Sequence, residues 1–233
     1  METVIEFKNV TKRFGETTVL DSLSFAVGKG EIFSIVGPSG TGKSVTLKHI
    51  VGLLEPDAGE VRLASRRIGY LFQSGALLAW MTVRENVALP LVETTRLSAE
   101  EIDAKVDVAL KAVGLTEAAD RYPAEISGGM QKRAGLARSI VREAEVVLYD
   151  EPTSGLDPVT AASITRLIRD LSRRLGVTSV VVTHDLPGAM KVSDRILLLK
   201  DGRAALCGTP ADFAASRDAA VMEFLSASKG EDL

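Results

Sequence analysis

The sequence has little of several features that would point to particular classes of protein. Its 233 residues include one cysteine, Cys207, which excludes an internal disulfide and favours a reducing compartment. No apolar run approaches the roughly 20 residues needed to cross a bilayer, so we expect any role at a membrane to be carried out from outside the lipid. The net charge of −3 argues against a general nucleic-acid binder, whose affinity would come from neutralising phosphates.

Targeting and repetitive segments are also missing. Residues 1–6 form an acidic, strand-like start without the basic region and apolar core of a secretory leader, so none is expected. No internal repeat or low-complexity segment is visible. The length suits a single α/β domain, or one core with an insert, and leaves no room for an appended regulatory domain.

What the chain does contain is a phosphate-binding pattern. Residues 37–44 fit G-x-x-x-x-G-K-[ST], directly after the apolar run 32–36 and directly before a helix-like stretch at 45–51. A flexible loop can match this pattern by chance, but the strand before it and the helix after it favour a nucleotide-phosphate site. The predicted phosphate loop consists of Gly37, Pro38, Ser39, Gly40, Thr41, Gly42, Lys43 and Ser44.

Two residues of this loop have predicted roles in the chemistry. Lys43 can reach the β- and γ-phosphates, and the Ser44 hydroxyl is placed to bind Mg²⁺. Phe14, some two dozen residues earlier, is either an ordinary packed aromatic or an exposed ring on which adenine stacks.

Polar residues follow three predicted strands, where open α/β sheets bind ligands. Gln73 follows the strand at 67–72 and could complete the shell of Mg²⁺ or of a water molecule. Asp150 and Glu151 follow the apolar strand at 146–149, and we expect Asp150 to face Mg²⁺ and Glu151 to act as general base. His184 follows the strand at 177–183 and could reach a γ-phosphate or the attacking water.

Two further segments have open interpretations. The apolar stretch 74–81, which carries the only tryptophan, is either a buried loop or an exposed docking surface for another protein. Ser127, Gly128 and Gly129 precede a basic helix predicted over 130–142, and a glycine pair before a helix is a second potential anion site. Asp157 and Pro158 are typical of a helix start.

The remaining pattern predicts a mixed α/β chain. Helical periodicity dominates from 83 to 143, and a capping box at 98–101 opens one of its helices. Residues 210–227 are predicted to form one C-terminal helix. The other predicted strands are 4–10, 17–27 and 60–63, with a hairpin formed by 195–200 and 203–206.

Together these motifs resemble the nucleotide-binding subunit of an ATP-binding-cassette (ABC) transporter over essentially the whole chain. The loop 37–44 resembles the Walker A motif, 147–151 the Walker B motif with its catalytic glutamate, and 127–131 the signature motif. Residues 154–157 resemble the D-loop. Gln73, His184 and Phe14 stand where the family has its Q-loop glutamine, switch histidine and adenine-stacking aromatic.

The resemblance implies a P-loop NTPase core with a mixed, largely parallel sheet, an N-terminal antiparallel β subdomain and an inserted α-helical subdomain. We therefore expect one ABC ATPase domain over 1–227, with the core in 1–82 and 145–227, the helical subdomain in 83–144, and a polar tail at 228–233. It also implies ATP and Mg²⁺ as ligands and a homodimer in which the signature of one protomer closes over ATP bound by the other.

A narrower resemblance is to the ATPases of Mla-type, Mce-associated phospholipid transporters. It rests on residues 72–77, on Met130 and on residues 86–91. It implies a peripheral location on the cytoplasmic side of the inner membrane, beneath a permease that docks near 73–81, with Mce-type proteins beyond it. Two alternatives stay open: a transporter ATPase for a metabolite or drug, and a soluble ABC protein that acts on DNA or ribosomes. The single phosphate loop and acidic balance argue against the latter.

Overall fold

The fold is described by a computed structural model covering residues 2–228, so residues 229–233 of the predicted polar tail lie outside it. The described chain divides into two compact units, one from residues up to Arg66 together with those from Gly176 onward, and the other from Arg67–Leu175. The prediction of a single domain over 1–227, with its helical insert at 83–144, stays a prediction. Each unit is described by itself below.

The first unit contains two β-layers built from strands whose burial follows their sequence. The antiparallel strands β2, β1 and β4 lie in that order, and β7, β3, β8 and β9 form a second array in which β3 is parallel to both β7 and β8. Every residue of β3 and β7 is buried, as expected for parallel strands covered on both faces. The strands are β1 (Thr3–Phe14), β2 (Thr17–Gly28), β3 (Ile32–Val36), β4 (Ala58–Leu63), β7 (Thr178–Thr183), β8 (Arg195–Lys200) and β9 (Arg203–Gly208).

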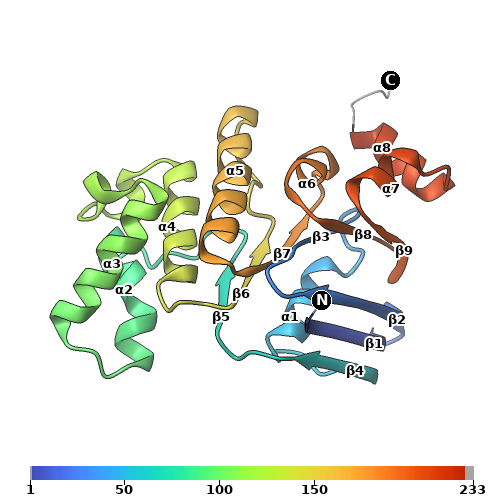
Figure 1. Ribbon diagram of the computed structural model, residues 1–233, viewed down its shortest axis with the longest axis horizontal. Helices are drawn as coiled ribbons and strands as arrows, with labels where there is room; N and C mark the ends of the chain where they lie inside the picture. The colour runs from blue at the N-terminus through green and yellow to red at the C-terminus, as the bar shows by residue number, and fades with distance from the viewer. Residues whose placement is uncertain (1, 229–233) are drawn as a thin grey trace. The chain divides into compact units, whose positions relative to one another are not determined.

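Four helices complete the described part of this unit. They are α1 (Lys43–Ile50), α6 (Leu186–Val192), α7 (Pro210–Ala215) and α8 (Ala219–Ser228), and Figure 1 shows α6, α7 and α8 gathered beside β8 and β9. Phe213 and Val221, from the last two helices, are fully buried in a cluster with Val36, Ile196 and Leu198 of the parallel strands. The C-terminal segment is therefore part of this unit's hydrophobic core.

The C-terminal segment differs from the single helix predicted over 210–227. It forms two helices, because α7 ends at Ala215 with Ser216 in an extended conformation. Asp218 then accepts a hydrogen bond from the amide of Ala220 at 2.8 Å, which marks a new helix start. The prediction of one helix was wrong because apolar periodicity continues across this break.

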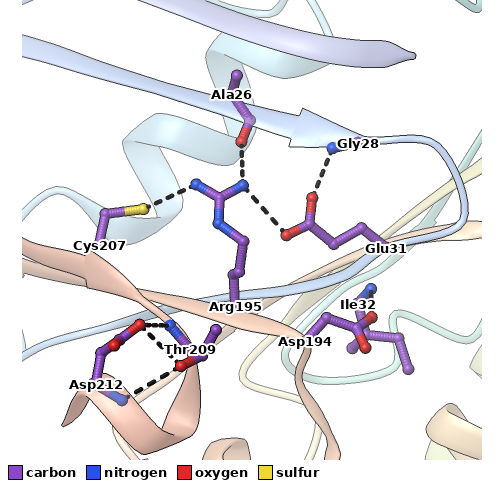
Figure 2. Close-up of polar contacts among 9 residues, drawn as sticks. All are labelled: Ala26, Gly28, Glu31, Ile32, Asp194, Arg195, Cys207, Thr209 and Asp212. Carbon is purple, nitrogen blue, oxygen red and sulfur yellow. Dashed lines mark hydrogen bonds and ion pairs between the residues drawn. The ribbon is translucent and has the colours of Figure 1, made fainter. Parts of the chain in front are cut away.

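An arginine at the start of β8 ties several strands of the first unit together (Figure 2). Arg195 donates to the carbonyl of Ala26 at 3.1 Å, to the buried carboxylate of Glu31 at 3.3 Å and to the sulfur of Cys207 at 3.3 Å. Glu31 also accepts a hydrogen bond from the amide of Gly28 at 2.6 Å. The buried carboxylate therefore has both a cationic and a backbone donor, as its burial requires.

The second unit combines a short parallel strand pair with a group of helices. Strands β5 (Ile68–Leu71) and β6 (Val146–Asp150) pair in parallel, with Leu71 opposite Tyr149. Helices α2, α3 and α4 pack against one another (Figure 1), which confirms the helical pattern predicted from 83 to 143. The helical segments are α2 (Val83–Thr94), α3 (Ala99–Val113), η1 (Thr116–Ala118), η2 (Pro123–Glu125), α4 (Gly128–Ile140) and α5 (Pro158–Leu175).

Candidate functional site

The phosphate loop leaves β3 and enters α1 through positions that only glycine fills without strain. Gly42 has φ 98°, and a Cβ there would lie 2.8 Å from Cδ2 of Leu20. At Gly37 a Cβ would lie 2.3 Å from the carbonyl oxygen of Leu199. The loop therefore runs against the strands beside it, and within the described residues no side chain caps the N terminus of α1. A helix start without a side-chain cap, directly after a glycine-rich loop, is typical of phosphate-binding sites.

Lys43 is held inside this loop. Its side chain is buried, and Nζ donates to the carbonyls of Gly37 at 2.8 Å and Pro38 at 2.9 Å. Thr41 caps the same carbonyl of Pro38 with its hydroxyl at 2.9 Å. The ammonium group thus lies on the inner side of the loop, where a phosphate cradled by the loop amides would be within reach of it.

Phe14, the candidate base-stacking residue, closes β1 in the same unit. Its side chain is 49% exposed, which rejects the alternative of an ordinary packed aromatic. Lys12 places its Nζ 5.7 Å from the ring centroid, and Nζ also bonds to Asp57 at 3.0 Å. Asp57 accepts a second hydrogen bond, from the amide of Arg13 at 2.6 Å. The Arg13 amide and the Lys12 ammonium hold the pKa of the Asp57 carboxyl below its ordinary value.

His184 follows β7 and is exposed, as expected for a residue at the carboxyl end of a strand. The next residue, Asp185, begins α6 by accepting a hydrogen bond from the amide of Gly188 at 2.8 Å. Helix α6 was not predicted, although Asp185 followed by Leu186 and Pro187 is a typical helix start. This helix start fixes the backbone directly behind His184.

The two predicted acidic residues at the end of β6, Asp150 and Glu151, have different backbone conformations. Asp150 is the last residue of the strand and is partly buried. Glu151 has φ 47°, a left-handed value that is uncommon outside glycine and typical of strained functional positions. The strand has therefore ended between them, which removes the constraint that adjacent strand residues point to opposite faces.

Tyr70 is a contact of Asp150 that the sequence did not reveal. Its phenol lies 3.2 Å from Oδ2 of Asp150, and its ring stacks on Phe72 at 4.3 Å between centroids. Burial, followed by the charge of Asp150, raises the pKa of the Tyr70 phenol. The phenol therefore remains a hydrogen-bond donor to Asp150 at any physiological pH.

Lys132 is a second residue that sequence reasoning missed. It lies on α4 and is only 6% exposed, and its Nζ donates to the backbone carbonyl of Gln73 and, at 3.4 Å, to that of Glu151. Burial lowers the pKa of the Lys132 ammonium, and the carboxylates of Glu151 and Asp150 oppose that shift. The side chain of Gln73 donates to the hydroxyl of Ser154 at 3.3 Å, so its amide oxygen is the atom suited to a cation.

The signature segment forms the first turn of α4. This helix begins at Gly128, two residues before the predicted start, and ends at Ile140, two residues before the predicted end. Ser127 is its N-cap and accepts a hydrogen bond from the amide of Met130 at 3.3 Å. Two basic residues of this helix, Lys132 and Arg133, turn their charged ends toward protein acceptors.

Asp157 caps α5, as the Asp-Pro pair predicted. Its Oδ1 accepts hydrogen bonds from the amides of Val159 and Thr160, each at 3.0 Å. Hydrogen bonds from Thr160 and Val159 lower the pKa of the Asp157 carboxyl. The role of Asp157 in nucleotide binding stays a prediction, and its role in the helix start accounts for its position.

The loop 74–81 is neither a helix nor a strand and is fixed by two polar side chains. Asn86, fully buried, accepts a hydrogen bond from the amide of Leu78 at 2.7 Å and donates to the carbonyls of Leu78 and Met81, each at 3.0 Å. Arg138 donates to the carbonyls of Gly75 and Ala76. Trp80 nevertheless remains 74% exposed, which favours the docking surface over the buried loop.

Comparison with known proteins decides the family. Residues 20–154 match the family described as ABC transporter. The chain belongs to the ABC transporter family. The Haemophilus influenzae intermembrane phospholipid transport system ATP-binding protein MlaF is 39% identical, over 99% of this chain and 92% of its own. The Fe(3+) ions import ATP-binding protein FbpC of Rhizobium etli is 41% identical, over 88% of this chain and 61% of its own.

A solved ABC cassette has the same fold. The ATP-binding cassette MJ0796, in a dimeric post-hydrolysis state bound to ADP and Pi, superposes with a TM-score of 0.79 at 34% identity, over 88% of this chain and 98% of its own. This confirms the predicted ABC ATPase fold, and with the family it confirms an ATP-hydrolysing subunit. Within residues 2–228, the helices are all too short or too polar to cross a membrane.

The residues predicted to hold Mg²⁺ fit that ion by their chemistry. The donors are a hydroxyl from Ser44, an amide oxygen from Gln73 and a carboxylate from Asp150, and hard oxygen donors are what Mg²⁺ prefers. The described residues contain no group of three or more histidine, cysteine or acidic side chains placed to hold a metal ion. Mg²⁺ in nucleotide sites needs no such cluster, because one or two carboxylates act together with phosphate oxygens.

Proposed function

We propose that this ABC ATPase energises phospholipid transport through a partner permease. The observation that carries the proposal is the 39% identity, across 99% of the chain, to a protein named as an ATP-binding component of intermembrane phospholipid transport. The iron-import relative is about as similar where it aligns but extends well beyond this chain. Near-complete mutual coverage therefore favours the lipid transporter over the alternative of another substrate.

In this proposal the phosphate loop binds the triphosphate of ATP. The first amides of α1 meet the phosphate oxygens, and Lys43 exchanges its bonds to Gly37 and Pro38 for bonds to the β- and γ-phosphates. Phe14 offers its exposed face to adenine. Ser44, Asp150 and Gln73 would hold Mg²⁺, which would supply positive charge beside the phosphates.

Hydrolysis is assigned to the residues at the strand ends. Glu151, carried out of the strand by its left-handed backbone, accepts the proton of the attacking water. His184 binds the γ-phosphate or the same water from the end of β7. Asp157 positions the D-loop segment by capping α5.

The proposed assembly is a homodimer beneath a permease. Ser127, Gly128 and Gly129 of one protomer would close over ATP bound by the other, as suits an anion-binding helix start separate from the phosphate loop. The exposed Trp80 on the 74–81 loop, which follows Gln73, would contact the permease on the cytoplasmic side of the inner membrane. An Mce-type substrate-binding protein would complete the transporter.

Hydrolysis is tested with three variants of the purified chain, assayed with its permease. Lys43→Ala should abolish ATP hydrolysis, whereas Lys48→Ala, an exposed lysine on the same helix, should retain it. Glu151→Gln should slow hydrolysis by about 10²–10⁴-fold while ATP still binds. Near wild-type hydrolysis by Glu151→Gln would refute the assignment of the base.

The substrate is tested by reconstituting the same complex into vesicles. Phospholipid transfer between membranes should depend on ATP and disappear with Lys43→Ala. ATPase stimulation by ferric ion or by a small metabolite, with none by phospholipid, would refute the lipid substrate and leave the ATPase assignment intact.

A further inference from the structure

A closed ring of hydrogen bonds joins the ends of β5 and β6 to α4 in the second unit. Lys132 donates to the carbonyls of Gln73 and Glu151, and the amide of Ser154 donates to the same Glu151 carbonyl at 3.1 Å. The side chain of Gln73 closes the ring by donating to the hydroxyl of Ser154 at 3.3 Å. Lys132 therefore contributes a charged donor to a ring in which the proposed base, Glu151, takes part through its backbone carbonyl.

Burying the ammonium group of Lys132 costs desolvation free energy, which specific partners must offset. Its side chain is 6% exposed, and lysine is almost never buried unless it is paired. Its ammonium group donates to backbone carbonyls that lie 59 and 19 residues away in the sequence. These carbonyls lie within two residues of the ends of β5 and β6.

The backbone that Lys132 holds is strained at Glu151. A left-handed φ of 47° is unfavourable for a residue with a side chain, so it persists only where surrounding contacts fix it. The carbonyl of Glu151 is one of the groups through which that conformation is fixed. If this carbonyl changed its orientation, the Glu151 carboxylate would move away from the position in which it can face an attacking water.

We propose that Lys132 is a positioning residue, which clamps the backbone of Gln73 and Glu151 together so that the base is held in its working orientation. The inference rests on the proposed function, because it takes Glu151 as the general base. Lys132 lies in the second turn of the helix that begins with Gly128 and Gly129. Contact of a nucleotide with that helix start is therefore transmitted to the base through one side chain.

The test measures ATP turnover and ATP binding for Lys132→Met, Lys132→Gln and Lys132→Arg in the assembled complex. Methionine fills the volume without a donor, and we expect kcat to fall about 10–100-fold, as for a catalytic group displaced by about 1 Å. The KM for ATP should change less than about threefold. The kcat of Lys132→Gln, which keeps one amide donor group, should lie between those of Lys132→Met and wild type. Lys132→Arg should recover most of the wild-type kcat.

Arg133→Met is the matched control. Arg133 is the next residue of α4, and its guanidinium bonds to the carbonyl of Val113 and the hydroxyl of Ser163, away from the strand ends. A loss of turnover as large in Arg133→Met as in Lys132→Met, in folded protein, would overturn the proposal. So would a kcat for Lys132→Met within about twofold of wild type.

A double variant separates this inference from the proposed function. If Lys132 acts through Glu151, then adding Lys132→Met to Glu151→Gln should slow single-turnover hydrolysis by less than about twofold further. A further loss equal to that of the single Lys132→Met variant would overturn the inference while leaving Glu151 as base. Should Lys132→Met not fold, Lys132→Gln and Lys132→Arg in the Glu151→Gln background decide the question by the same comparison.

Discussion

The ammonium group of Lys12 lies 5.7 Å from the centre of the Phe14 ring, and Asp57 holds it there with a 3.0 Å bond. Asp57 belongs to the turn that follows α1, the helix that opens with the phosphate loop. The Phe14 ring, which is proposed to stack on adenine, is thus supported by the turn after α1, and α1 begins at the proposed phosphate-binding loop. This relationship lies wholly within the first unit.

Phe14→Ala is expected to weaken ATP binding by about 5–150-fold, since base–aromatic stacking contributes about 1–3 kcal/mol. Phe14→Tyr keeps the ring and should bind ATP about as tightly as wild type. Asp57→Asn, which loses the ion pair with Lys12, should have a smaller effect than Phe14→Ala. Equilibrium binding of a fluorescent ATP analogue measures all three. Equal affinity of Phe14→Ala and wild type would contradict stacking.

Gly42→Ala is expected to prevent ATP binding. The added Cβ would lie 2.8 Å from Cδ2 of Leu20 at a residue with φ 98°, so the loop must shift to accept it. Gly52→Ala is the control, because Gly52 also has a positive φ of 72° but open space around its Cβ position. That variant should lose about 1 kcal/mol of stability and bind ATP normally.

Asn86→Ala is expected to lower the free energy of unfolding by about 2–3 kcal/mol. The change leaves the amide of Leu78 and the carbonyls of Leu78 and Met81 without the buried partner that satisfies them. Urea denaturation measures the loss, and limited proteolysis should cut the 74–81 loop more rapidly. Thr94→Ala, an exposed change on the same helix, should stay within about 0.5 kcal/mol of wild type.

Tyr70→Phe should remove part of the alkaline instability of the protein. The folded-state pKa of Tyr70 is raised above the unfolded value near 10, so the unfolded chain loses its proton first as pH rises. Stability contributed by the neutral phenol is therefore fully present below about pH 10 and is lost above it, at no more than about 1.4 kcal/mol per pH unit.

The measurement is urea denaturation of wild type and Tyr70→Phe between about pH 8 and pH 11. The difference in stability should be constant up to about pH 10 and then change in favour of the variant. If the free energies of unfolding of the two proteins ran parallel over the whole pH range, the pKa of the Tyr70 phenol would not be raised by folding. At neutral pH, Tyr70→Phe should also require more Mg²⁺ for half-maximal hydrolysis, because Asp150 loses a hydrogen-bond partner.

Local patterns carried most of the sequence prediction. The strand before residue 37 and the helix after residue 44 were predictable because apolar runs and glycine spacing are short-range features. The hairpin of β8 and β9 was predictable because Asp201 and Gly202 separate two strand-like runs. The break at Ser216 was not, since apolar spacing continues through it.

Contacts between distant segments could not be predicted in the same way. A lysine on a helix with several basic residues looks like part of a charged surface, yet Lys132 is buried against carbonyls from two other segments. Tyr70 looks like an alternating strand residue, and only pairing of β5 with β6 brings its phenol to Asp150. Such roles depend on tertiary neighbours that a single sequence does not specify.

The exposed side chain of Trp80 has one more consequence. It is the sole indole of the chain and is 74% exposed, so the tryptophan fluorescence of the protein comes from a single point on the 74–81 loop. A permease that covers this point should shift the emission to shorter wavelength and shield it from a dissolved quencher. The chain thus carries a native optical reporter for the proposed docking, which needs neither a dye nor a substitution.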